Sequence, residues 1–105
     1  MITIHKYKLP DGIAAFKIGL PAESKIMMIK EQNGTPTMWC QVDTDKPVVY
    51  YTFVVVGTGF DLDETVELVG DELYYLDSII GNVLVLHYYV VLNKDMIDYP
   101  LQKMV

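Results

Sequence analysis

Residues 48–56 read Val48-Val49-Tyr50-Tyr51-Thr52-Phe53-Val54-Val55-Val56, a run of β-branched and aromatic side chains that favours an extended strand. Residues 83–92 have the same character and read Val83-Leu84-Val85-Leu86-His87-Tyr88-Tyr89-Val90-Val91-Leu92. A strand with one face in water alternates apolar and polar residues, whereas these two strands are apolar on both sides. Two explanations stay open: these are core strands whose outward tyrosines are merely amphipathic, or another chain covers one face.

Turn residues divide the rest of the chain into similar short segments. Clusters of Gly, Pro, Asn and Asp recur at roughly 8–12 residue spacing, as in small β-proteins. No segment shows the apolar stripe of a helix, and the acidic residues 61–72 form at most one helical turn. We therefore predict an all-β fold, a small antiparallel β-sandwich or partly open barrel with little or no helix. Its strands are expected at residues 2–9, 13–18, 24–32, 36–42, 47–56, 65–69 and 82–92, and residues 73–80 are expected to add another short strand or a turn.

The sharpest local signal is the dipeptide Asn33-Gly34. Asn and Gly tolerate the positive φ angles of a tight reverse turn, so we predict a hairpin that joins the strands at 24–32 and 36–42. Alternation along the second strand directs Met38, Cys40 and Val42 towards the core and Trp39 to the opposite face.

Length and composition favour one folded domain. The 105 residues suit a single core, and 51% hydrophobic against 21% charged residues excludes disorder as the default state. We expect a single β domain at residues 1–92 and a C-terminal extension at 93–105. No apolar run reaches the roughly 18 residues that span a bilayer, so a soluble cytoplasmic protein without a membrane partner is expected. Cys40 stands alone, which fits a reducing compartment.

The charge balance limits the choice of partners. Fourteen acidic residues stand against eight basic residues, all of them Lys, and the net charge is −6. Arg is the residue best suited to phosphates and guanine edges, so its absence argues against DNA reading. A duplex would also be repelled unless lysines gathered on one face, for which Lys6, Lys8 and Lys17 are the local candidates. We therefore expect no direct DNA binding.

The chemistry-bearing residues do not form a familiar catalytic motif. Cys40, in an alternating strand, is expected to be a buried small hydrophobe, and His87 a structural histidine. The acidic loops at 43–45 and 61–64 could converge and offer oxygen ligands, but they lack the spacing of a calcium loop, and solvated charge is the ordinary explanation. We predict no catalytic residues, no metal site and no cofactor.

Several motifs together resemble one family. Residues 3–9, the Asn33-Gly34 hairpin leading to Trp39, the segment 42–45, and Phe53 followed by Gly57-Thr58-Gly59 are similar to small uncharacterised proteins encoded by phages and prophages. The resemblance covers roughly residues 3–90. Members usually carry His directly after the Gly-Thr-Gly turn, where this chain has Phe60. The resemblance implies a phage origin and a role in binding, including antagonism of host defence, and it transfers no catalytic residue.

Two functions are therefore expected. The first is a non-catalytic antagonist that docks onto a host defence protein in the host cytoplasm, through acidic loops and exposed aromatic residues. The alternative is an oligomeric sponge that holds a small nucleotide immune signal in pockets between chains, with bases stacked on Tyr or Trp. Candidate binding residues are Trp39, Tyr50, Tyr51, Tyr88 and Tyr89, with Lys6, Tyr7 and Lys8 as the first candidates for a nucleotide.

Self-association is expected as well. A sandwich covers only one side of each sheet with its own second layer, so the strands at 48–56 and 83–92 need a further cover. A symmetric homodimer is the favoured solution, because one self-complementary patch suffices. Tyr50 and Tyr51 point in opposite directions, so one of them belongs to the core and the other to the candidate interface.

Overall fold

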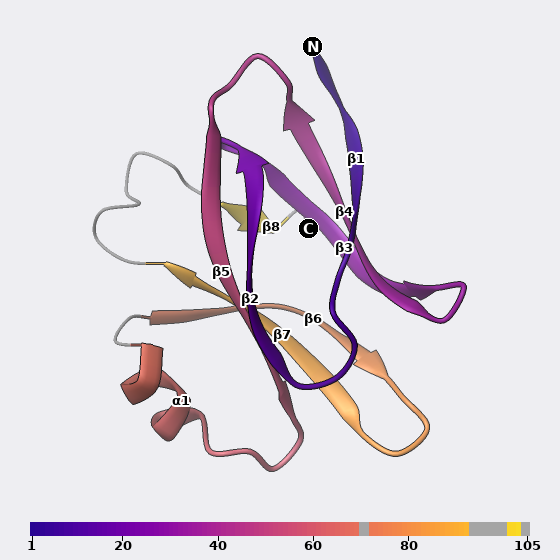
Figure 1. The fold of residues 1–105 in the computed structure, drawn as a ribbon, viewed down its shortest axis with the longest axis vertical. Helices are drawn as coiled ribbons and strands as arrows, with labels where there is room; N and C mark the ends of the chain where they lie inside the picture. Colours follow the sequence, from indigo (N-terminus) through magenta and orange to yellow (C-terminus); the bar gives the residue numbers. More distant parts are fainter. Residues whose placement is uncertain (70–71, 93–100, 104–105) are drawn as a thin grey trace.

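The computed structural model describes residues 1–69, 72–92 and 101–103 of the chain, drawn as a coloured ribbon in Figure 1. Within these residues the chain forms eight strands and one helix. In chain order they are β1 (Ile2–Lys8), β2 (Ala14–Pro21), β3 (Lys25–Gln32), β4 (Thr35–Asp43), β5 (Val48–Gly57), α1 (Leu62–Val69), β6 (Glu72–Ile80), β7 (Val85–Leu92) and β8 (Gln102–Lys103).

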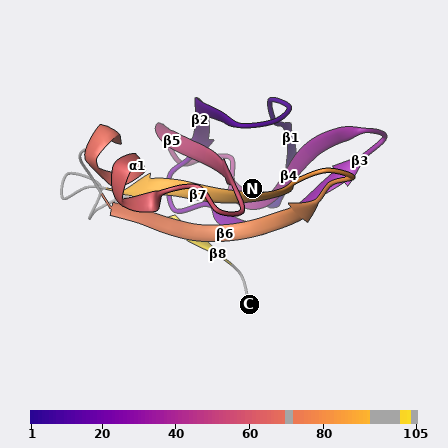
Figure 2. The ribbon, with the colours of Figure 1, turned by 90° about the horizontal axis from the view of Figure 1, so that it is seen from below.

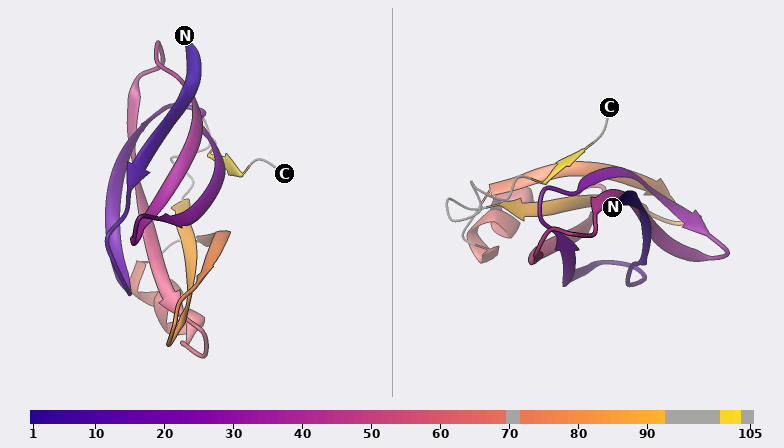
Figure 3. Two further views of the ribbon diagram at one scale, coloured as in Figure 1. Left: turned by 90° about the vertical axis from the view of Figure 1, so that its right-hand side faces the viewer. Right: turned by 90° about the horizontal axis from the view of Figure 1, so that it is seen from above.

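The strands make two four-stranded sheets that pack as layers. The first sheet has the order β1-β4-β3-β8 and the second the order β2-β5-β7-β6. Every described strand pair is antiparallel except β3 with β8. The molecule is flattened, 40 × 34 × 22 Å, with α1 and the tip of the β3–β4 hairpin at opposite ends (Figures 2 and 3). The predicted all-β, mainly antiparallel fold is confirmed.

The β3–β4 hairpin forms where the sequence predicts it. Asn33 and Gly34 have φ angles of 51° and 80°, and Gln32 pairs with Thr35 across the turn. Both φ values lie in the left-handed region that this dipeptide tolerates. In β4, the side chains of Met38, Cys40 and Val42 are buried in the core, and Trp39, half-buried, lies on the other face. The predicted facing of this strand is therefore confirmed.

The two-sided apolar strands are the central pair of the second sheet. Tyr51, Phe53 and Val55 of β5 and Tyr88 and Val90 of β7 face the first sheet and belong to the main core. The residues that alternate with them form a second cluster on the outer face of the sheet, made of Val54, Val56 and Val91 with Leu73 and Tyr89 packed against it. The two strands are apolar on both sides because each face of the second sheet carries a cluster of packed apolar side chains.

The burial of Tyr51 and Tyr88 corrects their assignment as binding residues. Both side chains are fully buried between the two sheets, and a side chain without exposed surface cannot contact a partner of the folded protein. Tyr50, the neighbour of Tyr51, is 67% exposed on the outer face. Alternation thus assigns Tyr51 to the core and leaves Tyr50 as the interface candidate.

The strand expected at residues 65–69 is wrong, because these residues belong to α1. The Asp61 carboxylate accepts hydrogen bonds from the backbone N–H groups of Asp63 (2.9 Å) and Glu64 (3.2 Å), which satisfies two free donors of the first turn. Asp63 and Glu64 also place negative charge at the positive end of the helix dipole. This N-cap outweighs the strand propensity of the β-branched residues that follow.

The expected C-terminal extension lies mostly outside the described residues, at 93–100 and 104–105. Residues 101–103 return to the first sheet. Leu101 is buried in the core, and Gln102 and Lys103 pair in parallel with Lys25 and Ile26 of β3. Part of the segment at 93–105 therefore contributes to the same core as residues 1–92.

We predict that Tyr88→Phe stabilises the protein. The Tyr88 hydroxyl is buried and has no hydrogen-bond partner among the described residues. Removing an unsatisfied buried hydroxyl should raise the free energy of unfolding by about 1 kcal/mol, measured by urea denaturation at pH 7. A loss of 1 kcal/mol or more would contradict this prediction, because it would show that the hydroxyl is satisfied.

The same variant should change the response to alkali. Burial raises the pKa of the Tyr88 phenol to about 12, above its ordinary value of 10.0. The folded state therefore holds this proton more tightly than the unfolded chain, so this contribution to stability is complete below about pH 10 and is lost as the pH rises towards 12. Tyr88→Phe should lose less stability than the wild type over that interval.

Candidate functional site

The outer face of the first sheet gathers lysines around the single tryptophan. Residues directly opposite each other on neighbouring strands share a face. Across β1, β4 and β3, the outward rows read Lys8–Thr37–Lys30, Lys6–Trp39–Met28 and Ile4–Gln41–Lys25. We call this surface the lysine face; it consists of Lys6, Lys8, Lys25 and Lys30 with Trp39, Met28 and Ile4. All four lysines are exposed, and Trp39 is half-buried at the centre.

Three of the candidate residues from the sequence therefore lie together. Lys6 is directly opposite Trp39, and Lys8 is one row away. Tyr7 alternates with them, points to the other side of β1, and contacts His5 with a hydroxyl-to-Nδ1 distance of 3.4 Å. The structure thus brings Lys6, Lys8 and Trp39 together and separates Tyr7 from them.

The contacts of the lysines leave most of their donors available. The Lys6 amine donates to the Gln32 side-chain oxygen at 3.0 Å, and the Lys30 amine lies 3.8 Å from the Asp77 carboxylate. Asp77 also accepts the Ile29 backbone N–H at 2.9 Å and so links β6 to β3. An ammonium group has three donors, so each of these lysines can still bind an anion.

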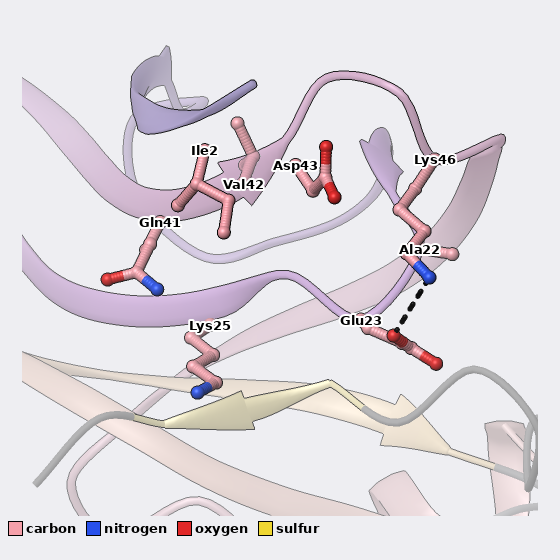
Figure 4. A pocket seen from close by; sticks show the side chains of 8 residues that line it. All are labelled: Ile2, Ala22, Glu23, Lys25, Gln41, Val42, Asp43 and Lys46. Carbon is pink, nitrogen blue, oxygen red and sulfur yellow. Dashed lines mark ion pairs between the residues drawn. The ribbon is translucent and has the colours of Figure 1, made fainter.

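A pocket of about 180 Å³ shares Lys25 with the lysine face. Figure 4 shows the side chains that line it. Lys25 and Gln41 lie at one end of it, and the Lys46–Glu23 ion pair, 3.5 Å between nitrogen and oxygen, lies at the other. Cavities that bury a drug-sized ligand hold about 300–1,000 Å³. This pocket is therefore an extension of an open surface rather than an enclosed ligand site.

The outer face of the second sheet carries the tyrosines. Tyr75 and Tyr89 pair across β6 and β7 with their rings edge to face at 5.7 Å, and Tyr50 lies further along β5. We call this surface the tyrosine face; it consists of Tyr50, Tyr75 and Tyr89 around Val54, Val56, Val91 and Leu73. Tyr50 and Tyr75 are at least half exposed. Of the tyrosines predicted to bind, Tyr50 and Tyr89 belong to this surface.

His87 links β6 and β7 to the turn that follows β5, at the end of the tyrosine face. Its Nδ1 lies 2.7 Å from the Ser78 hydroxyl, and its Nε2 lies 2.8 Å from the Thr58 hydroxyl. The Ser78 hydroxyl is in turn 2.7 Å from the Tyr75 hydroxyl. Both ring nitrogens are thus occupied by hydroxyl groups, and among the described residues no carboxylate forms a hydrogen bond with the ring. This arrangement fits the structural role that the sequence predicts for His87.

The start of α1 covers part of the tyrosine face beside His87. Phe60 and Leu62 line a pocket of about 230 Å³ together with Val56, His87 and Tyr89. The chain therefore supplies some of the cover that its second apolar face requires. Phe60 contributes an apolar wall to this pocket.

The two acidic loops lie at opposite ends of the molecule and do not converge. In Figure 1 the β4–β5 loop with Asp43 and Asp45 is close to the N-terminus, whereas Asp61 precedes α1 at the far end. Asp43 and Asp45 contact the amino group of Met1 at 3.3 and 2.9 Å, and the hydrogen bond from the Asp45 backbone helps to lower the pKa of Asp43. Among the described residues, no three His, Cys, Asp or Glu side chains gather to hold a metal ion.

Basic and acidic residues are distributed unevenly along the sequence as well as between the two faces. Residues 1–57 contain six of the eight lysines and five acidic residues, whereas residues 58–105 contain nine of the fourteen acidic residues. The negative net charge therefore belongs to the second part of the chain. Lys25 and Lys30 were not among the sequence candidates, although they complete the lysine face.

Comparison with known proteins identifies one family. A family model described as "Domain of unknown function (DUF7352)" matches residues 1–96. No curated protein and no solved structure gives a significant match. In the part of the chain that the structure describes, no helix has the length and apolar character needed to cross a membrane.

Proposed function

The chain belongs to the DUF7352 family of domains of unknown function, and from this premise we propose that it is a non-catalytic binding protein that docks onto a protein partner through the tyrosine face. The resemblance to small phage proteins supports a host defence protein as that partner, antagonised by direct docking in the host cytoplasm. No cofactor is needed for such a role.

The composition of the tyrosine face carries this proposal. Exposed Tyr50 and Tyr75 surround three valines that are almost fully buried. The chain itself buries these valines, so the exposed rings of Tyr50 and Tyr75 are the groups that a partner would contact. Tyrosine is enriched among the residues that dominate binding energy at protein interfaces. The surface is open rather than enclosed, which favours a macromolecular partner over a small molecule.

A second copy of the chain is the expected occupant of the same face when no target is present. A symmetric pair buries the same self-complementary patch on both copies. The protein target would then compete with the second copy for the tyrosine face. The homodimer is accordingly part of the proposal, and its own test is given in the Discussion.

The alternative function, a sponge for a small nucleotide, requires enclosed pockets between chains. The two pockets described above, about 180 and 230 Å³, are smaller than the usual range for a bound ligand. Lys6, Lys8 and Trp39 favour an anionic ligand, but on an open surface. Docking through the tyrosine face is therefore the preferred function.

The adjacent residues Tyr74 and Tyr75 give a matched test. Both are about half exposed, at 47% and 50%, but Tyr75 belongs to the tyrosine face and Tyr74 points the other way, with its hydroxyl bonded to Glu72. In affinity capture from host-cell lysate followed by mass spectrometry, Tyr75→Ala should reduce recovery of a stoichiometric partner at least tenfold, as expected for an aromatic anchor. Tyr74→Ala should retain the partner. Equal loss in both variants, or loss in neither, would contradict the proposal.

A further inference from the structure

The lysine face concentrates positive charge, although the chain as a whole is acidic. Four of the eight lysines project from β1 and β3, the two strands that flank β4, and the rows that contain them include no carboxylate. Lys30 lies 3.8 Å from Asp77 at the sheet edge, and Glu23 and Asp43 line the pocket next to Lys25. A mobile polyanion would be attracted to this face and repelled by the acidic residues of the second part of the chain.

Trp39 gives the lysine face an aromatic platform. It lies in the central strand, with Lys6 opposite on one side and Met28 opposite on the other. Its side chain is half-buried, so the sheet holds the ring in place while part of its surface is free. Ile4 and Met28 add exposed apolar surface beside it. On an open sheet, lysines can attract the phosphate backbone of a nucleic acid while an aromatic ring between them stacks against a base.

We propose that the lysine face binds single-stranded nucleic acid, with lysines on the phosphates and Trp39 against a base. This function is additional to docking through the tyrosine face, which lies on the other sheet. Lysine is depleted in protein interfaces, so four lysines around one aromatic residue favour a phosphate chain over an acidic protein. A duplex suits the face less well, because its bases are stacked internally and cannot reach Trp39.

The lysines that gather on one face are not the ones expected from the sequence. A duplex was expected to be repelled unless lysines gathered on one face, and Lys17 was one of the local candidates. Lys17 instead lies on β2, opposite Thr52, in the other sheet. Lys25 and Lys30 of β3 take its place beside Lys6 and Lys8.

Trp39 is the only tryptophan, so its fluorescence reports directly on this face. The probe is an oligothymidylate of about 12 nucleotides, within the site sizes of sheet-based single-strand binders. At low salt it should quench Trp39 fluorescence with a Kd between about 1 and 100 µM. If four phosphates are neutralised, the plot of log affinity against log salt should have a slope of about −3. If oligonucleotide concentrations up to about 1 mM do not quench Trp39 fluorescence, the proposal is overturned.

Lys8→Glu and Lys17→Glu form the matched control pair. Both replace an exposed strand lysine and change the net charge equally, but only Lys8 belongs to the lysine face. Lys8→Glu should weaken binding about tenfold, and Lys17→Glu less than twofold, with both variants folded by circular dichroism. Equal weakening would show that net charge rather than the face attracts the oligonucleotide, and would overturn the proposal.

Two further probes separate the other possible partners. A duplex of the same length should quench at least tenfold more weakly than the single strand. Polyglutamate of similar charge should not quench Trp39, because it has no base to stack. Equal binding of the duplex would instead indicate a site for duplex nucleic acid. Equal quenching by polyglutamate would instead indicate a surface that binds an acidic protein. Either result would overturn the proposal. None of these outcomes depends on the tyrosine face.

Discussion

Tyr51→Glu should unfold the protein, whereas Tyr50→Glu should leave it folded. Tyr51 is completely buried between the sheets, so the variant would force a carboxylate into the core or expose the core to water. A cost above about 4 kcal/mol is expected, a large fraction of the 5–15 kcal/mol that stabilises a typical domain. Tyr50 is 67% exposed on the neighbouring face, and a charge there stays in water.

Cys40 provides the measurement for this pair. Its thiol is buried, and burial raises its pKa to about 12, so in the folded protein it is both inaccessible and protonated at pH 8. In Tyr51→Glu a thiol reagent should label Cys40 at the rate of an unstructured peptide. In the wild type and in Tyr50→Glu, labelling should be at least 100-fold slower. Protection of Cys40 in Tyr51→Glu would mean that the core accommodates the charge, against this prediction.

The register of one hairpin explains how far sequence reasoning could reach the lysine face. A two-residue turn at Asn33-Gly34 pairs Gln32 with Thr35, and counting outward sets Lys30 opposite Thr37, close to Trp39. The position of Lys30 on the lysine face could therefore be predicted from the sequence. The position of Lys25 could not, because the register shifts between Ile26 and Met28. Without this bulge Lys25 would be opposite Val42 and would share the core face.

The errors of the sequence analysis have similar local causes. Residues 65–69 contain two valines and a threonine and resemble a strand, but the Asp61 cap lies before this window and starts a helix. Alternation shows that Tyr50 and Tyr51 face opposite ways, yet only the packing of one sheet on the other decides which is buried. The all-β class could be predicted without either fact, because the turn spacing and the two strands that are apolar on both sides were sufficient.

Tyr50→Glu should also convert a dimer into a folded monomer. In a symmetric pair that buries roughly 800 Å² of each tyrosine face, the same residue meets the interface twice, so one substitution introduces two charges. Loss of two aromatic contacts and burial of two carboxylates should raise the dissociation constant at least 100-fold. Light scattering at high micromolar concentration should give twice the monomer mass for the wild type and the monomer mass for Tyr50→Glu.

Lys8→Glu is the control for self-association, because it adds negative charge to the opposite sheet and should remain dimeric. This variant also separates the two surfaces: Tyr50→Glu should still quench Trp39 on oligonucleotide binding, whereas Lys8→Glu should dimerise and bind weakly. A wild-type monomer at high micromolar concentration would contradict self-association. The valine cluster is already almost fully buried within one chain and needs no second copy. The exposed tyrosines would then be left to the protein target, where Tyr75→Ala still tests them.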